Sequence, residues 1–159
     1  MSDLPDILRE RGLTVSAAES LTAGLVQSAL ASKSGSSAYF QGGITVYNLD
    51  QKVEHLGVDG THGLEVNSVS STVVGQMAHG VRRMFNTDIG LATTGYAEPN
   101  PEHGVVRPYA WIGVMIGDND LYCKKVVFPN RSRSDVRAAV TTALLTFLTK
   151  LLLEDSDES

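Results

Sequence analysis

Hydroxyl and amine side chains that together could hydrolyse an amide are concentrated in one stretch, SGSSAYFQGGITVYNLDQK. Ser36 and Ser37 lie on a tight Gly-Ser turn, and Lys52 follows Tyr47 at a distance of five residues. A serine hydroxyl attacks a carbonyl only when a base takes its proton, and a desolvated lysine can be that base once its pKa falls below the free value of about 10.4. Tyr47 could relay the proton or keep the amine neutral. The alternative interpretation is a simple turn followed by a surface lysine.

A second group of hydroxyls lies in the segment ESLTAG, between an expected strand and an expected helix. Ser20 is the natural N-cap of that helix, and Thr22 follows it. Unpaired N–H groups at a helix N-terminus attract an anion such as phosphate, and Ala23 and Gly24 would keep its approach clear. The alternative is that both hydroxyls only cap the helix. The segment is not a Walker loop, since the Gly-Lys-Ser/Thr ending is missing.

Hydrophobic periodicity places these residues on alternating strands and helices. The expected helices cover residues 4–11, 21–32, 51–56 and 68–85, and a last helix begins at Ser132 or Ser134. The expected strands cover residues 13–18, 42–48, 88–95, 109–116 and 121–128, with a hairpin turn, GDND, between the last two. This order predicts an α/β fold, a three-layer α/β/α sandwich with a mixed central sheet of about five strands.

The Pro- and Gly-punctuated segment GYAEPNPEHGVVRP, from Gly95 to Pro108, follows the strand expected in the centre of the sheet. In open α/β sheets the ligand crevice lies at the carboxyl ends of strands. We therefore expect the loop from Tyr96 to Pro108 to edge the site and to set its selectivity.

Composition indicates one globular domain over residues 1–152, followed by an acidic disordered tail at 153–159. The net charge of −5 and the lack of a basic stripe argue against a nucleic-acid partner. We expect no membrane span and no secretory signal, hence a cytoplasmic protein, in keeping with its single cysteine, Cys123. The four histidines lack metal-ligand spacing, so neither a metal nor a cofactor is expected. If the chain assembles, a homodimer is the commonest form.

Several of these segments together resemble the CinA C-terminal domain family, nicotinamide mononucleotide deamidases. The resemblance begins in TVSAAESLTAGLVQSALASKSGSSAYFQGGITVYNLDQKVEHLGV and covers roughly residues 5–150. It continues through Val69 and Ser70, through TTGYAEP, and through NRSRSDVRAAV. Several motifs in the family's order are more specific than any one of them.

The resemblance implies that the carboxamide of nicotinamide mononucleotide is hydrolysed to nicotinic acid mononucleotide and ammonia, without a metal. By matching position, Ser37 would be the nucleophile, Lys52 the general base and Tyr47 its partner. The residues expected to bind the phosphorylated substrate or shape its pocket are Ser20, Thr22, Gly24, Ser36, Thr94, Gly95 and Arg133. Arg133 would supply a fixed positive charge, with Arg137 as the competing candidate.

The chain also departs from the family pattern. Ala23 replaces a glycine, Glu98 stands where the family has glycine, and PYAWI replaces Pro-Val-Gly-Thr-Val. A carboxylate close to a phosphate would repel it unless it turned outward or paired with Arg107. Two other functions therefore remain as hypotheses: a module of the same fold that binds a nucleotide or another phosphometabolite without hydrolysing it, and a hydrolase of a different amide.

Overall fold

The computed structural model describes the backbone of residues 3–157 and the side-chain surroundings of residues 3–155. Its helices are α1 (Leu4–Arg11), α2 (Leu25–Ala31), α3 (Leu49–Leu56), α4 (Gly60–Glu65), α5 (Ser71–Phe85) and α6 (Arg133–Asp157), with short 3₁₀ helices η1 (Ser36–Ala38) and η2 (Pro101–His103). Its strands are β1 (Val15–Glu19), β2 (Phe40–Thr45), β3 (Ile89–Tyr96), β4 (Tyr109–Ile116) and β5 (Asp120–Val127).

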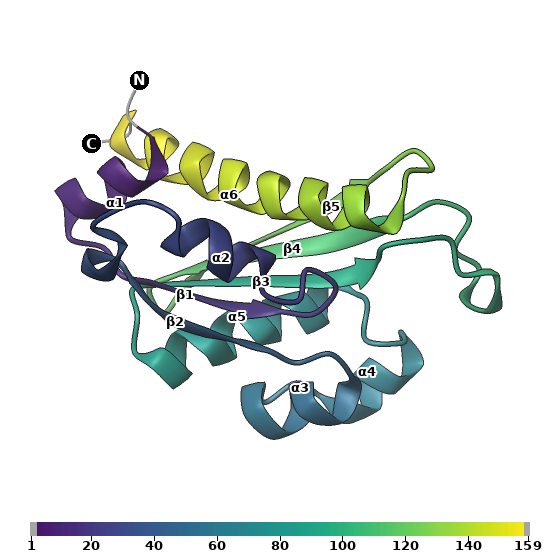
Figure 1. The fold of residues 1–159 in the computed structure, drawn as a ribbon. Coiled ribbons are helices and arrows are strands. Elements are labelled where there is room, and N and C mark those ends of the chain that lie inside the picture. Colours follow the sequence, from purple (N-terminus) through teal and green to yellow (C-terminus); the bar gives the residue numbers. More distant parts are fainter. Residues whose placement is uncertain (1–2, 158–159) are drawn as a thin grey trace.

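The five strands form one mixed sheet in the order β2-β1-β3-β4-β5. β1 runs parallel to both β2 and β3, whereas β4 is antiparallel to β3 and to β5. The helices cover both faces, with α1, α2 and α6 on one side and α3, α4 and α5 on the other (Figure 1). The three-layer fold and the mixed five-stranded sheet predicted from the sequence are confirmed.

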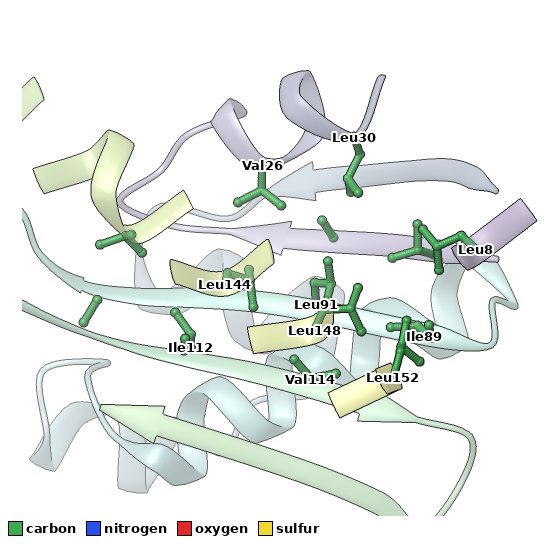
Figure 2. Packing of buried hydrophobic residues seen from close by; sticks show 14 of the residues in the cluster. Leu8, Val26, Leu30, Ile89, Leu91, Ile112, Val114, Leu144, Leu148 and Leu152 are labelled. Carbon is green, nitrogen blue, oxygen red and sulfur yellow. The ribbon is translucent and has the colours of Figure 1, made fainter. Parts of the chain in front are cut away.

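Each face of the sheet packs against its own hydrophobic cluster. Because side chains alternate along a strand, Val15 and Ala17 belong to the cluster under α1, α2 and α6, while Ala18 belongs to the cluster under α5. Figure 2 shows the first cluster, in which leucines of α6 meet β3 and β4 side chains such as Leu91 and Ile112. The spacing of apolar residues on the last helix predicts a buried side made of Val136, Val140, Leu144, Leu148 and Leu151. The first four are buried, whereas Leu151 is only partly buried and Leu152 is buried in its place.

Local sequence signals explain where most helices begin and end. The Asn48 side chain caps α3, and Ser70 caps α5 by accepting a hydrogen bond from the Val73 N–H. Gly12 ends α1 in the left-handed conformation, with φ of 63°. Gly90 allows α5 to pack closely on β3, because a Cβ there would overlap the carbonyl oxygen of Ala78.

Three local predictions were wrong. The second helix begins at Leu25 instead of residue 21, so Ser20 is not its N-cap. A short helix, α4, forms in a segment where none was expected. The tail was expected to be disordered from residue 153, but α6 continues to Asp157 because its apolar side still reaches the core there through Leu152. Residues 158–159 lie outside the described residues.

Within the described residues, α6 is also long and apolar enough to span a membrane by length and composition, with a mean hydropathy of 1.6 over its most apolar window. Its buried side chains, however, pack against the sheet and against α1 and α2. This is the arrangement of a core helix.

Candidate active site

The carboxyl ends of β1, β2 and β3 lie at the same edge of the sheet, because these three strands are parallel. The segments that follow them line a cavity of about 490 Å³. Ser20 follows β1, Tyr47 and Lys52 follow β2, and Glu98 follows β3, while Arg133 reaches the cavity from the start of α6. In Figure 1 the arrowheads of β1 and β3 point toward the side on which α3 and α4 lie.

Lys52 is the buried cationic side chain of this cavity, with a relative exposure of 1%. Its Nζ lies 3.0 Å from Ser20 Oγ, 3.0 Å from the Val46 carbonyl oxygen and 3.2 Å from the Tyr47 carbonyl oxygen. Burial disfavours the charged ammonium and lowers the pKa of Lys52 from 10.5 to about 8. A substantial fraction of this lysine is therefore neutral at mildly alkaline pH.

The three contacts of Lys52 suit a general base. A neutral amine has two N–H groups and one lone pair, and the carbonyls of Val46 and Tyr47 can accept the two N–H groups. The ammonium form donates its third N–H group to Ser20 Oγ at 3.0 Å, and in the neutral form the lone pair takes the place of that N–H group. The hydroxyl proton of Ser20 can thus pass directly to Lys52, which is what activation of a serine nucleophile requires.

Burial of Lys52 also predicts a pH-dependent stability. Because its folded-state pKa of about 8 lies below the ordinary lysine pKa of 10.5, the unfolded chain binds more protons between these two pH values. Burying the charged amine therefore destabilises the folded protein by about 3 kcal/mol below pH 8. This destabilisation is relieved as the pH rises from 8 to 10.5. Urea denaturation of the wild type and of Lys52→Met measures this effect. We expect the difference between their free energies of unfolding to shift by about 3 kcal/mol in favour of the wild type between pH 8 and pH 10.5. A difference that stayed constant with pH would show that Lys52 titrates normally.

Glu19, the last residue of β1, accepts hydrogen bonds from the backbone N–H groups at the N-terminus of α2. It is fully buried and accepts hydrogen bonds from the Val26 N–H at 2.8 Å, the Gln27 N–H at 3.0 Å and the Gln27 side-chain amide at 3.0 Å. These N–H groups were predicted to bind a substrate anion, and that prediction was wrong because a carboxylate of the chain itself occupies the position. Gly24, expected to keep the anion's approach clear, is instead the left-handed N-cap of α2, with φ of 100°.

The turn that carries Ser20 is held from two sides. Thr93 Oγ1, on β3, accepts a hydrogen bond from the Ser20 N–H at 3.2 Å and lies 2.9 Å from Thr22 Oγ1. From α6, Arg137 donates to the carbonyl oxygens of Leu21 at 2.7 Å and Thr22 at 3.2 Å. Thr22 and Arg137 therefore support the turn and do not line the cavity. For Thr22 this corrects the expected contact with the phosphorylated substrate and leaves the expected role in shaping the pocket, and for Arg137 it corrects the competing role as anion ligand.

Arg133 lines the cavity, as predicted, and its guanidinium has two partners. Nη2 donates to the Tyr47 hydroxyl at 2.7 Å, and Nη1 lies 3.1 Å from Glu98 Oε1. In the described part of the chain, Tyr47 contacts Lys52 through its carbonyl oxygen, whereas its hydroxyl contacts Arg133. The predicted role of the Tyr47 phenol as partner of Lys52 is therefore corrected to a partner of Arg133. Arg107, suggested from the sequence as a partner for Glu98, does not make that contact.

Thr94 and Gly95 line the cavity at the end of β3, as the sequence predicted. The Thr94 hydroxyl donates to the Ser68 carbonyl oxygen at 2.7 Å and so ties β3 to the segment before α5. Asn67 and Ser68, also in the lining, both have positive φ values, 49° and 64°. Non-glycine residues in this conformation are strained, and such residues cluster at functional sites.

Ser36 and Ser37 lie at the other end of the molecule. They belong to η1, which precedes β2, whereas Lys52 follows β2. The six residues of β2 separate them, a length of about 20 Å at about 3.3 Å per residue (Figure 1). The Ser36 hydroxyl is 3.4 Å from the Ala31 carbonyl oxygen, and neither serine lines the cavity. The predicted pairing of Ser37 with Lys52 was wrong, as was the substrate-binding role of Ser36.

A signal in the sequence makes Ser20 a candidate partner of Lys52, although it does not by itself choose Ser20 over Ser37. Ser20 directly follows one strand and Lys52 follows the next strand along the chain. Parallel neighbours bring their carboxyl ends together, so residues after two such strands can meet although 32 positions separate them in the sequence. The support from Thr93 and Arg137 had no comparable signal, since it depends on how β3 and α6 pack around the turn.

Among the residues that the structure describes, no group of three or more His, Cys, Asp or Glu side chains lies close enough to hold a metal ion. The cavity instead contains hydroxyl, amine, guanidinium and carboxylate groups suited to acid–base and nucleophilic chemistry.

Known proteins are similar to this chain in sequence and in fold. The model of the CinA C-terminal domain family matches residues 1–152. A protein of Streptococcus thermophilus named competence-damage inducible protein is 36% identical over 151 residues, which cover 95% of this chain and 36% of that protein. A CinA-like protein of Shewanella piezotolerans is 35% identical over 152 residues, covering 94% of this chain and 35% of that protein. The chain thus spans about a third of the length of these relatives.

Solved structures are similar over nearly the whole chain. The competence damage-inducible protein A of Klebsiella pneumoniae superposes with a TM-score of 0.87 at 25% identity, covering 92% of this chain and 90% of that one. The competence/damage inducible protein CihA of Agrobacterium tumefaciens gives a TM-score of 0.83 at 28% identity, covering 91% and 88% of the two chains.

Proposed function

Since this chain belongs to the CinA C-terminal domain family, we propose that it is an amide hydrolase in which Ser20 is the nucleophile and Lys52 the general base. The single observation that carries this proposal is the 3.0 Å contact between Lys52 Nζ and Ser20 Oγ inside a cavity, with the pKa of Lys52 lowered by burial. A perturbed lysine beside a hydroxyl in a cleft is the arrangement expected of an activated nucleophile.

The reaction proceeds in two halves. Lys52 takes the proton of Ser20, and Oγ attacks the carbonyl carbon of the carboxamide to form a tetrahedral intermediate. The Lys52 ammonium then gives its proton to the departing nitrogen, which leaves as ammonia and leaves an ester on Ser20. Water, deprotonated by Lys52, attacks this ester, and the carboxylic acid is released as Ser20 regains its proton. The Leu21 backbone N–H, adjacent to the nucleophile, is our candidate donor to the oxyanion.

The substrate class that we propose is a pyridine nucleotide carrying a carboxamide, with nicotinamide mononucleotide hydrolysed to nicotinic acid mononucleotide and ammonia. The cavity of about 490 Å³ falls in the usual range of small-molecule sites. Its buried end holds Ser20 and Lys52 for the carboxamide, and its exposed end holds Arg133, a cation suited to a phosphate.

Ammonia release from purified protein tests this function directly. We expect nicotinamide mononucleotide to be hydrolysed with a kcat/KM that rises about tenfold between pH 7 and 9, because Lys52 loses its proton near pH 8. A panel of other carboxamides, measured in the same way, would identify a different preferred amide. If no amide releases ammonia across this pH range, the hydrolase proposal is wrong.

One observation favours a binding module without hydrolysis as the second candidate function. Glu98 replaces a glycine of the family pattern and contacts Arg133 within the cavity. Titration calorimetry with the nucleotide, combined with the ammonia assay, distinguishes the two functions, because a binding module would give heat of binding and no ammonia.

A further inference from the structure

The carboxylate of Glu98 pairs with the guanidinium of Arg133, the group that would otherwise attract a ligand anion. Of the described residues that line the cavity, three carry charge: Lys52, Arg133 and Glu98. Lys52 is buried and turned toward Ser20 and two carbonyl oxygens. Arg133 is the exposed cation, with 47% of its side chain accessible, and its Nη1 is 3.1 Å from Glu98 Oε1. The exposed end of the cavity is therefore close to neutral.

The segment that carries Glu98 forms part of the cavity wall. The Tyr96 hydroxyl ties its start to the opposite wall by accepting a hydrogen bond from the Asn67 side-chain amide at 2.9 Å. Beyond Glu98, Asn100 and Val105 exchange two backbone hydrogen bonds, at 3.0 Å and 2.9 Å, which close the loop on itself. Residues 96–100 all line the cavity, so the backbone at Glu98 belongs to its wall.

We propose that Glu98 is a specificity-determining residue that reduces the preference of this site for a phosphorylated substrate over the same carboxamide without phosphate. A ligand phosphate must displace Glu98 from Arg133 and then lie near a carboxylate of like charge. A riboside ends in a neutral hydroxyl and meets neither obstacle. The substrate class extends accordingly from the nucleotide to the nucleoside form of the carboxamide.

The pair Arg133–Glu98 is exposed, so it can open at little cost, and the effect of Glu98 comes mainly from its charge near the ligand. Nicotinamide mononucleotide and nicotinamide riboside form a matched pair of probes, because both carry the pyridinium ring and the carboxamide and differ only in the phosphate. The inference rests on the proposed function for the choice of these probes, but its measurement does not require turnover.

The test is calorimetric binding of both probes in a Ser20→Ala background, which prevents hydrolysis, with and without Glu98→Gln. We expect Glu98→Gln to tighten the mononucleotide about fivefold to tenfold and to change the riboside by less than about twofold. Glu102→Gln is the matched control, since Glu102 lies on the same loop in η2 but does not line the cavity, and it should change neither affinity.

An equal effect of Glu98→Gln on both probes, or no effect on the mononucleotide, would overturn the inference, as would failure of the Glu98→Gln protein to bind the mononucleotide. Ammonia release by the wild-type protein is measured in a separate experiment. Turnover without the Glu98→Gln effect supports the proposed function and rejects this inference. The binding effect without turnover supports this inference and rejects the proposed function.

Discussion

Replacing either member of the proposed pair, by Ser20→Ala or by Lys52→Ala, is expected to lower kcat/KM for amide hydrolysis by about four orders of magnitude or more. The first removes the attacking oxygen, and the second removes the base 3.0 Å from it. Because the two residues act as one unit, the double variant should be hardly worse than either single variant. The measurement is ammonia release at saturating and limiting substrate, with folding checked by circular dichroism.

Ser37→Ala is the matched control for this experiment. It removes the same hydroxyl from an exposed 3₁₀ helix at the opposite end of β2, so activity should stay near the wild-type level. Ser36→Ala should behave in the same way. Full activity of Ser20→Ala, together with loss of activity in Ser37→Ala, would contradict the site described by the geometry.

The second large effect is expected at Glu19, where Glu19→Ala should lower the free energy of unfolding by about 3 to 4 kcal/mol. The substitution removes the acceptor for the backbone N–H groups of Val26 and Gln27 and leaves a cavity at a fully buried position. Urea denaturation measures the loss. Activity should also fall, because the released start of α2 adjoins the turn that holds Ser20.

Glu19→Gln separates the charge from the shape. The amide can accept from one N–H group, but its NH₂ then faces the other donor, so a smaller loss of about 1 to 2 kcal/mol is expected. Glu10→Ala, at an exposed glutamate of α1, is the control and should change stability by less than about 0.5 kcal/mol. If Glu19→Ala were as mild as Glu10→Ala, solvent would already satisfy the first turn of α2.

The sequence by itself determined the layers of this protein and located part of its candidate site. Strands and helices alternate with clear periods of burial, and the hairpin from Tyr109 to Val127 follows from two strand patterns around a turn. These features are local, so composition and spacing were enough to predict a mixed sheet between two helical layers. Lys52 and the loop after β3 were located for the same reason, since both follow strands.

The tertiary structure alone decided which hydroxyl meets the lysine. Ser37 is closer to Lys52 in the sequence, but β2 runs between them, so they lie at opposite ends of this strand. Ser20 is further away in the sequence, yet β1 and β2 are parallel neighbours, and their carboxyl ends place Ser20 Oγ 3.0 Å from Lys52 Nζ. The direction and pairing of strands are long-range properties that spacing along one chain does not encode.

Tertiary packing also decided the roles of the charged groups. Glu19 turns back onto the start of α2, and Arg137 reaches across from α6 to the turn after β1. Glu98 meets Arg133 although 35 positions separate them. In each case the partner of a charge is set by which elements pack together. A buried charge such as Glu19 pairs with the donors that the fold brings within reach, and the exposed pair Arg133–Glu98 forms where the start of α6 lies beside the loop after β3. Residue types in the sequence therefore identified the candidates, and the packing of α6 and of the loops around the parallel strands assigned their partners.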